Sequence, residues 1–74
     1  MHHVHAEMVA NVWKQVAFVG QGVAPDDVLV ILESMKMEIP VLAECGGRLA
    51  SFAVAEGSFV QEGDLIATID EVIA

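Results

Sequence analysis

An internal repeat of 37 residues, half of the 74-residue chain, divides this sequence into two units with the same pattern. The halves align without a gap, and an apolar run at 28–33 falls on a second one at 65–70. The identical positions are Val4 and Val41, Ala6 and Ala43, Glu7 and Glu44, Gly20 and Gly57, Val23 and Val60, and Asp27 and Asp64. A repeat of this kind indicates one folding unit that is used twice.

Within each unit, short runs of β-branched and aliphatic residues alternate with residues typical of tight turns. The runs are about five residues long, which suits strands, and no stretch has the i, i+3, i+4, i+7 apolar face of a helix. We therefore predict an all-β fold: a small sandwich or flattened barrel of short antiparallel strands, whose halves are related by an approximate two-fold axis. The turn residues are Gly20, Gly22, Pro25, Asp26, Asp27, Gly57, Gly63 and Asp64.

Size and charge limit what such a chain can do. It is 55% hydrophobic with a mean hydropathy of +0.60, so we predict one domain over residues 1–74, near the lower size limit for a core without disulfides. The 11 acidic and 3 basic residues give a net charge of -8, which disfavours nucleic acid and membrane surfaces as partners. The apolar runs are far shorter than the roughly 20 residues that span a bilayer, and the N-terminus lacks an apolar signal core, so we expect a cytoplasmic protein.

One hexapeptide, Glu33-Ser34-Met35-Lys36-Met37-Glu38, stands between two apolar runs. We predict a β-hairpin whose tip spans residues 34–37, with Lys36 in water. Met35 and Met37 are unusual at such a tip, because an exposed turn needs no apolar side chain for its own stability. Flexible thioethers at an exposed position favour a surface that another protein recognises.

This hexapeptide resembles the biotin-attachment motif of biotin carboxyl carrier domains, whose usual core is Ala-Met-Lys-Met. Lys36 matches the modified lysine of that family and Met35 and Met37 match its methionines, while Ser34 replaces the usual alanine and Val9-Ala10 replaces a frequent Pro-Gly. The resemblance implies a free-standing biotinyl-attachment domain with the fold that biotinyl and lipoyl families share. It covers most of the chain, through Met8, Val12-Trp13-Lys14, Gly20, Val23 and Gly63-Asp64-Leu65-Ile66.

The resemblance implies that the chain is a biotin carrier and not an enzyme. A biotin-protein ligase would present biotinyl-adenylate to the amine of Lys36, which would form an amide. A biotin carboxylase would then carboxylate the biotin with bicarbonate and ATP, and a carboxyltransferase would pass the carboxyl group to an acceptor such as an acyl-CoA. The residues agree with a passive role, because an ordinary lysine, with a pKa of about 10.4, is charged at neutral pH, and Glu33 and Glu38 favour that ammonium form.

Two other functions stay open on the sequence. One is a lipoyl carrier on the same fold, and the other is an unmodified interaction module in which Met35 and Met37 simply contact a partner. The lipoyl family has Asp-Lys-Ala at this site, so the two methionines count against lipoate.

Four other groups of residues favour a structural role over a catalytic or metal-binding one. Gly20-Gln21-Gly22 is predicted to be a turn with positive φ, since neither a helix nor a lysine follows it as in a phosphate loop. Asp26-Asp27 is predicted to bond backbone amides of its own turn. The histidines of residues 2–5 are assigned to an edge strand, facing water. Cys45 has no cysteine partner and no obvious activating base.

Three further expectations concern packing and the chain ends. Pro40 cannot donate to a sheet ladder, so its strand is predicted to lie at an edge. Trp13 is expected to be partly buried against the sheet. Because the repeat maps Lys36 onto the gap between the chain ends, the two termini are expected side by side, on the face opposite Lys36.

Overall fold

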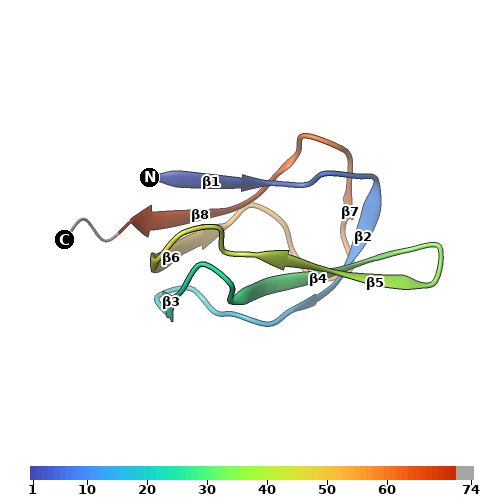
Figure 1. The fold of residues 1–74 in the computed structure, drawn as a ribbon. Helices are drawn as coiled ribbons and strands as arrows, with labels where there is room; N and C mark the ends of the chain where they lie inside the picture. Colours follow the sequence, from blue (N-terminus) through green and yellow to red (C-terminus); the bar gives the residue numbers. More distant parts are fainter. Residues whose placement is uncertain (72–74) are drawn as a thin grey trace.

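The computed structural model describes residues 1–71, which form eight β-strands (Figure 1). These residues contain no helix, and so none that is long and apolar enough to cross a membrane. The all-β prediction is therefore confirmed. The strands are β1 (His2–His5), β2 (Ala10–Gln15), β3 (Gly22–Val23), β4 (Val28–Ser34), β5 (Met37–Leu42), β6 (Gly47–Phe52), β7 (Phe59–Val60) and β8 (Leu65–Glu71).

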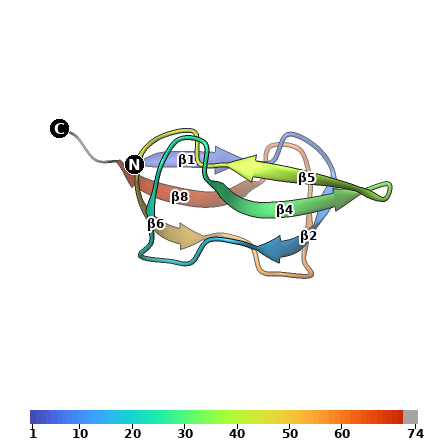
Figure 2. The same ribbon diagram turned by 60° about the horizontal axis from the view of Figure 1, so that its bottom comes forward.

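The strands form two antiparallel sheets that pack face to face as a flattened sandwich (Figures 1 and 2). Sheet A has the order β1-β8-β6-β3, and sheet B has the order β5-β4-β2-β7. Adding 37 to the bounds of β2, β3 and β4 gives those of β6, β7 and β8. The same shift places the residues of β1 within β5. Replacing each strand by its counterpart turns the order of one sheet into that of the other. The predicted two-fold repeat is confirmed, and each sheet takes strands from both halves.

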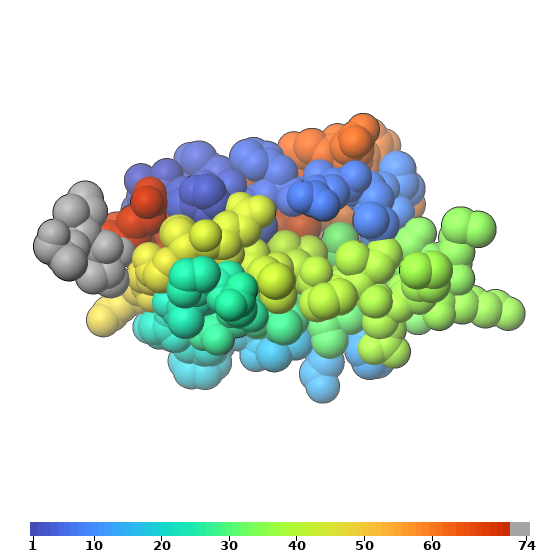
Figure 3. Space-filling model, viewed as in Figure 1, coloured from blue at the N-terminus to red at the C-terminus, as the bar shows by residue number. Residues whose placement is uncertain are grey.

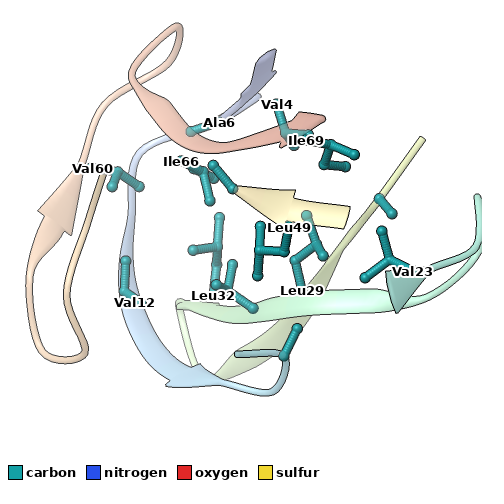
Figure 4. Packing of buried hydrophobic residues seen from close by; sticks show 14 of the residues in the cluster. Val4, Ala6, Val12, Val23, Leu29, Leu32, Leu49, Val60, Ile66 and Ile69 are labelled. Carbon is teal, nitrogen blue, oxygen red and sulfur yellow. The ribbon is translucent and has the colours of Figure 1, made fainter. Parts of the chain in front are cut away.

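The core lies between the sheets and consists of aliphatic side chains from both halves (Figure 4). Strand alternation sends every second side chain inward: in β2, Ala10 and Val12 are buried while Asn11 is exposed. Truncating one large buried side chain to alanine typically costs about 2–5 kcal/mol, so a domain of this size depends on each of them. The largest are Leu29, Leu32, Leu49, Ile66 and Ile69.

The turns that precede β4 and β8 are built alike. The Oδ2 atom of Asp27 accepts a hydrogen bond of 2.9 Å from the backbone N–H of Ala24. In the second half, Oδ2 of Asp64 accepts one of 2.8 Å from the backbone N–H of Gln61. Asp27 therefore closes its own turn, as predicted, and the two turns provide each half with the same entry into its longest strand.

The prediction for Gly20-Gln21-Gly22 is right for its first residue and wrong for its last. Gly20 has a φ of 94°, in the region that favours glycine. Gly22 does not have a positive φ; it begins β3 and pairs with Arg48 in sheet A. Its counterpart in the second half is Phe59, so this backbone conformation accepts a large side chain.

The edges and ends of the sandwich agree with the sequence. Pro40 lies in β5 at the edge of sheet B, and β1 with its histidines is the edge of sheet A. Trp13 is half-buried. The N-terminal amine lies 3.9 Å from Oε1 of Glu71, at the end of the molecule opposite the β4–β5 hairpin (Figure 1). The expected meeting of the chain ends is confirmed as far as Glu71, and Ala74 lies outside the described residues.

Candidate functional site

Lys36 lies at the tip of the hairpin formed by β4 and β5, as predicted. Met35 and Lys36 alone join the two strands, and their φ angles are 52° and 66°. Positive φ at both central residues is the geometry of a type I′ turn, in which Asn-Gly or Gly-Gly is preferred. A non-glycine residue with positive φ costs on the order of 1–2 kcal/mol. Met35 and Lys36 therefore occupy the turn at the expense of stability, which points to a functional reason for their presence.

The side chains of this tip stand in water. Met35 is 92% exposed, Met37 is 63% exposed, and Lys36 is exposed as well. Figure 3 shows the end of the hairpin projecting beyond the body of the molecule. Apolar side chains in this position contribute nothing to the core, so they are available for contact with another molecule.

The base of the hairpin is firmly held. β4 is paired on both sides. On one side it pairs with β5, beginning at the tip with Ser34 opposite Met37, and on the other side it pairs with β2. Leu32, four residues before Lys36, is almost fully buried and fixes the strand to the core. The tip consequently presents Lys36 at a defined place, while the four methylenes of its side chain stay free to move.

Two carboxylates flank the tip. Glu33 and Glu38 are exposed and lie directly opposite each other in the β4–β5 pairing, an arrangement of like charges that is unfavourable for stability. Within residues 1–71, the N-terminal amine lies near Glu71 and the His2 ring lies near Glu44, and Lys36 takes part in no ion pair. An exposed ammonium becomes a nucleophile only when a base removes its proton. The described residues place no such base beside Lys36.

The other reactive side chains lie at the far end of the sandwich. Burial raises the pKa of the Cys45 thiol, and the carboxylates of Glu71 and Glu44 raise it further, which opposes formation of a nucleophilic thiolate. Nε2 of His2 lies 2.7 Å from Oε1 of Glu44 and links β1 to the loop that follows β5. These residues are not brought to the hairpin and do not add to its site.

Sequence reasoning did not anticipate a cavity of about 370 Å³ beside β1 and β5. Its apolar lining includes Leu32, Ile39 and Val41, with His5 among its polar residues. No periodic pattern signals this cavity, because it forms where strands from different halves approach. The three residues 35–37 are not part of its lining, so Lys36 is a projecting side chain and not a pocket residue.

Comparison with known proteins gives consistent matches over nearly the whole chain. The family model described as "Biotin-requiring enzyme" matches residues 3–69. The chain is 52% identical over 66 residues to the biotinylated protein TB7.3 homolog of Mycobacterium leprae, covering 89% of this chain and 93% of that protein. It is 40% identical to the biotin/lipoyl attachment protein of Bacillus subtilis, over 85% of this chain and 86% of that protein.

Solved structures share the fold. A urea carboxylase from Kluyveromyces lactis matches 93% of this chain with a TM-score of 0.89 and 35% identity, and this chain spans only 6% of it. The lipoyl domain of the 2-oxoglutarate dehydrogenase complex from Azotobacter vinelandii matches 92% of this chain with a TM-score of 0.74 and 25% identity; here 96% of the compared chain is covered. The same sandwich thus occurs both as a unit of a much larger chain and as a small domain.

Proposed function

This chain belongs to the family of biotin-requiring enzymes, and we propose that Lys36 is the residue through which it carries biotin. Within that family it is a carrier domain and not a catalyst, and the predicted cofactor, biotin, agrees with the matched family and relatives. The attachment site and the enzymes that act on it are the parts that we propose.

One observation carries the assignment of Lys36: the two-residue turn. Met35 and Lys36 hold positive φ in a turn for which other residues are far better suited, and both are exposed. The site fits a covalently attached group, since within residues 1–71 Lys36 takes part in no ion pair and its side chain is exposed. Lys14, by contrast, lies within β2 and is paired in the middle of a sheet.

Attachment is proposed to require a biotin-protein ligase. With its proton removed in the ligase site, the Lys36 amine attacks the acyl carbon of biotinyl-adenylate. A C–N amide bond forms, the acyl–phosphate bond breaks, AMP leaves, and the second amine proton passes to a base or to solvent. Met35 and Met37, on either side of the lysine, are the side chains that we expect the ligase to contact.

The partners after attachment are proposed to be a biotin carboxylase and a carboxyltransferase. Bound biotin would supply a ring that takes up a carboxyl group at one active site and releases it at another. The contribution of this chain is positional: a rigid hairpin base carries a flexible side chain, so the tethered group stays at high local concentration near whichever enzyme holds the domain.

The test is mass spectrometry of the protein after incubation with a biotin-protein ligase, biotin and ATP. We expect one biotinyl group per chain, located at Lys36 and absent from Lys36→Arg. Lys14→Arg is the matched control, since it changes the other lysine, and it should leave biotin incorporation unchanged. Biotin on Lys14, or full incorporation in Lys36→Arg, would contradict the assignment.

A lipoyl carrier is the second candidate, because a lipoyl domain shares the fold. The same assay with a lipoate ligase and lipoate decides between the two. We expect no lipoylation, since Met35 and Met37 stand on either side of Lys36, where the lipoyl family has the aspartate and alanine of Asp-Lys-Ala. Lipoate on Lys36 in place of biotin would contradict the biotin proposal and show that the chain is a lipoyl carrier.

A further inference from the structure

The internal repeat allows each half to serve as a control for the other. Equivalent positions have the same strand and the same place in their sheet. A side chain that the fold itself requires is therefore expected in both halves. A large apolar side chain that is present in only one half, and is exposed there, calls for a reason outside the fold.

On the outer face of sheet B, Trp13 and Phe59 meet this description, while the partly buried Ile31 and the exposed Pro40 extend the apolar surface beside them. Their counterparts, 37 residues away, are small or polar. We call the four residues the sheet B patch: Trp13 on β2, Ile31 on β4, Pro40 on β5 and Phe59 on β7, with counterparts Ala50, Thr68, His3 and Gly22 in sheet A.

The strand pairing places these residues together. Ile31 pairs with Pro40 on one side and with Lys14 on the other, so the three share one face of the sheet. Trp13 directly precedes Lys14 and is the unpaired residue of a β-bulge in β2. Phe59 lies on the neighbouring strand β7, which pairs with the start of β2. The patch therefore runs across the whole width of sheet B.

The bulge does not explain the tryptophan. Sheet A has the same bulge between Leu49 and Ser51, and there the unpaired residue is Ala50. Trp13 is 50% exposed and Phe59 is 58% exposed. Partly exposed aromatic side chains of this kind supply most of the binding energy in many protein interfaces. Their presence on one sheet only indicates a contact surface.

The patch adjoins the hairpin that carries Lys36. Ile31 precedes Lys36 by five residues, a distance on the order of 15 Å along a strand. Glu33 and Glu38 lie between them on the same outer face, because they are two residues from Ile31 and Pro40 and are paired with each other. An enzyme that takes the end of the Lys36 side chain into its active site and extends over this face of the hairpin covers the patch. Its matching surface would be apolar, with lysine or arginine groups opposite the two carboxylates.

We propose that the sheet B patch is the surface on which a biotin carboxylase subunit docks. The matching surface of that subunit would be an apolar area bordered by basic side chains. This inference rests on the proposed function, since it assigns a partner to the group attached at Lys36. The contact is of the weak, transient class, because the carrier has to leave one active site for the next.

The experiment measures carboxylation of the biotinylated protein by a biotin carboxylase subunit, purified from the source by its ability to carboxylate free biotin with ATP and bicarbonate. The variant is Trp13→Ala with Phe59→Thr: alanine is the residue at the equivalent bulge, and threonine keeps a strand-forming side chain. Phe18→Ala is the matched control, because Phe18 is also exposed but lies in the loop beside the start of β4, away from the hairpin. Thermal unfolding followed by circular dichroism checks that each variant is folded.

We expect the KM of the double variant to rise about tenfold with kcat within twofold, since docking is lost equally from ground and transition state. Phe18→Ala should keep the original KM, and biotin incorporation by the ligase should be unchanged in both. An unaltered KM in the folded double variant overturns the inference, as does an equal rise in Phe18→Ala. A defect confined to biotin incorporation would assign the patch to the ligase and likewise overturn it. If the unmutated protein takes up no biotin at all, the proposed function is wrong. That result is distinct from a failure of the docking inference, which requires a protein that carries biotin.

Discussion

Replacing Met35-Lys36 by Asn-Gly is expected to stabilise the protein while removing its proposed site of biotin attachment. Both positions have positive φ, and each non-glycine residue there costs on the order of 1–2 kcal/mol. Asn and Gly are the residues that a type I′ turn prefers, so we expect a gain of about 1–2 kcal/mol in the free energy of unfolding. Little packing is lost, since Met35 is almost fully exposed. For a domain of this size, each 1 kcal/mol raises Tm by about 4–8 °C.

The measurement is thermal and urea unfolding of the protein without biotin, so that the attached group does not affect the comparison. Lys36→Arg is the control, because it removes the proposed attachment site but keeps a long side chain at positive φ. Its Tm should stay within about 1 °C of the original. An Asn-Gly variant with an unchanged or lower Tm would show that the turn is not strained. The argument that Met35 and Lys36 are held there for function would then fail.

Three further changes test other parts of the site and fold. Met35→Asp with Met37→Ala should lower the rate of biotin attachment at least about tenfold without changing Tm, because both methionines are largely exposed. Unchanged kinetics would mean that the ligase recognises the hairpin shape alone. Glu38→Lys, opposite Glu33, replaces like charges by opposite ones and should stabilise by about 0.5 kcal/mol at low salt, with less gain in 1 M NaCl; a loss of stability at low salt would contradict the pairing. Gly47→Ala should destabilise by about 1–3 kcal/mol in urea unfolding, because the added methyl group would collide with the backbone of β8; an unaffected midpoint would show that the two strands are not so close.

The architecture was predictable because two kinds of pattern agreed. The repeat required two equivalent units, and the five-residue aliphatic runs between turn residues required strands, so an all-β sandwich with two-fold symmetry followed. Pro40 marked an edge for a simple reason: a residue without an N–H cannot take part in a ladder on both sides. The place of Lys36 at a hairpin tip was predictable because its hexapeptide stands between two apolar runs, and the structure confirms that place. The attachment of biotin to Lys36 stays a prediction.

The remaining features depend on backbone geometry that residue types do not specify. Met35-Lys36 is not a recognised type I′ pair, so its two positive φ angles could not be foreseen. Gly22 was expected to need positive φ because glycine often does, yet its sheet pairing with Arg48 uses an ordinary strand conformation. The β-bulge at Trp13 likewise could not be predicted, because the surrounding residues have the pattern of an ordinary strand. The proposed contact surface became visible only when the structure showed which of the repeated positions lie together, exposed, on the outer face of one sheet.

The interleaving of the two halves has a consequence for when the protein can be modified during its synthesis. β1 is synthesised first, yet its strand partner among residues 1–71 is β8, which is synthesised last. His3 therefore cannot pair with Thr68 until nearly the whole chain has been made. Ile66 and Ile69 of β8 also fill the core on which the hairpin strands rest. A ribosome-bound chain that has already exposed Lys36 therefore has the lysine and the methionines, but not the firm base beneath them. We expect the ligase to act on completed chains, because the final strand is the one that closes the sandwich and fixes the tip in place.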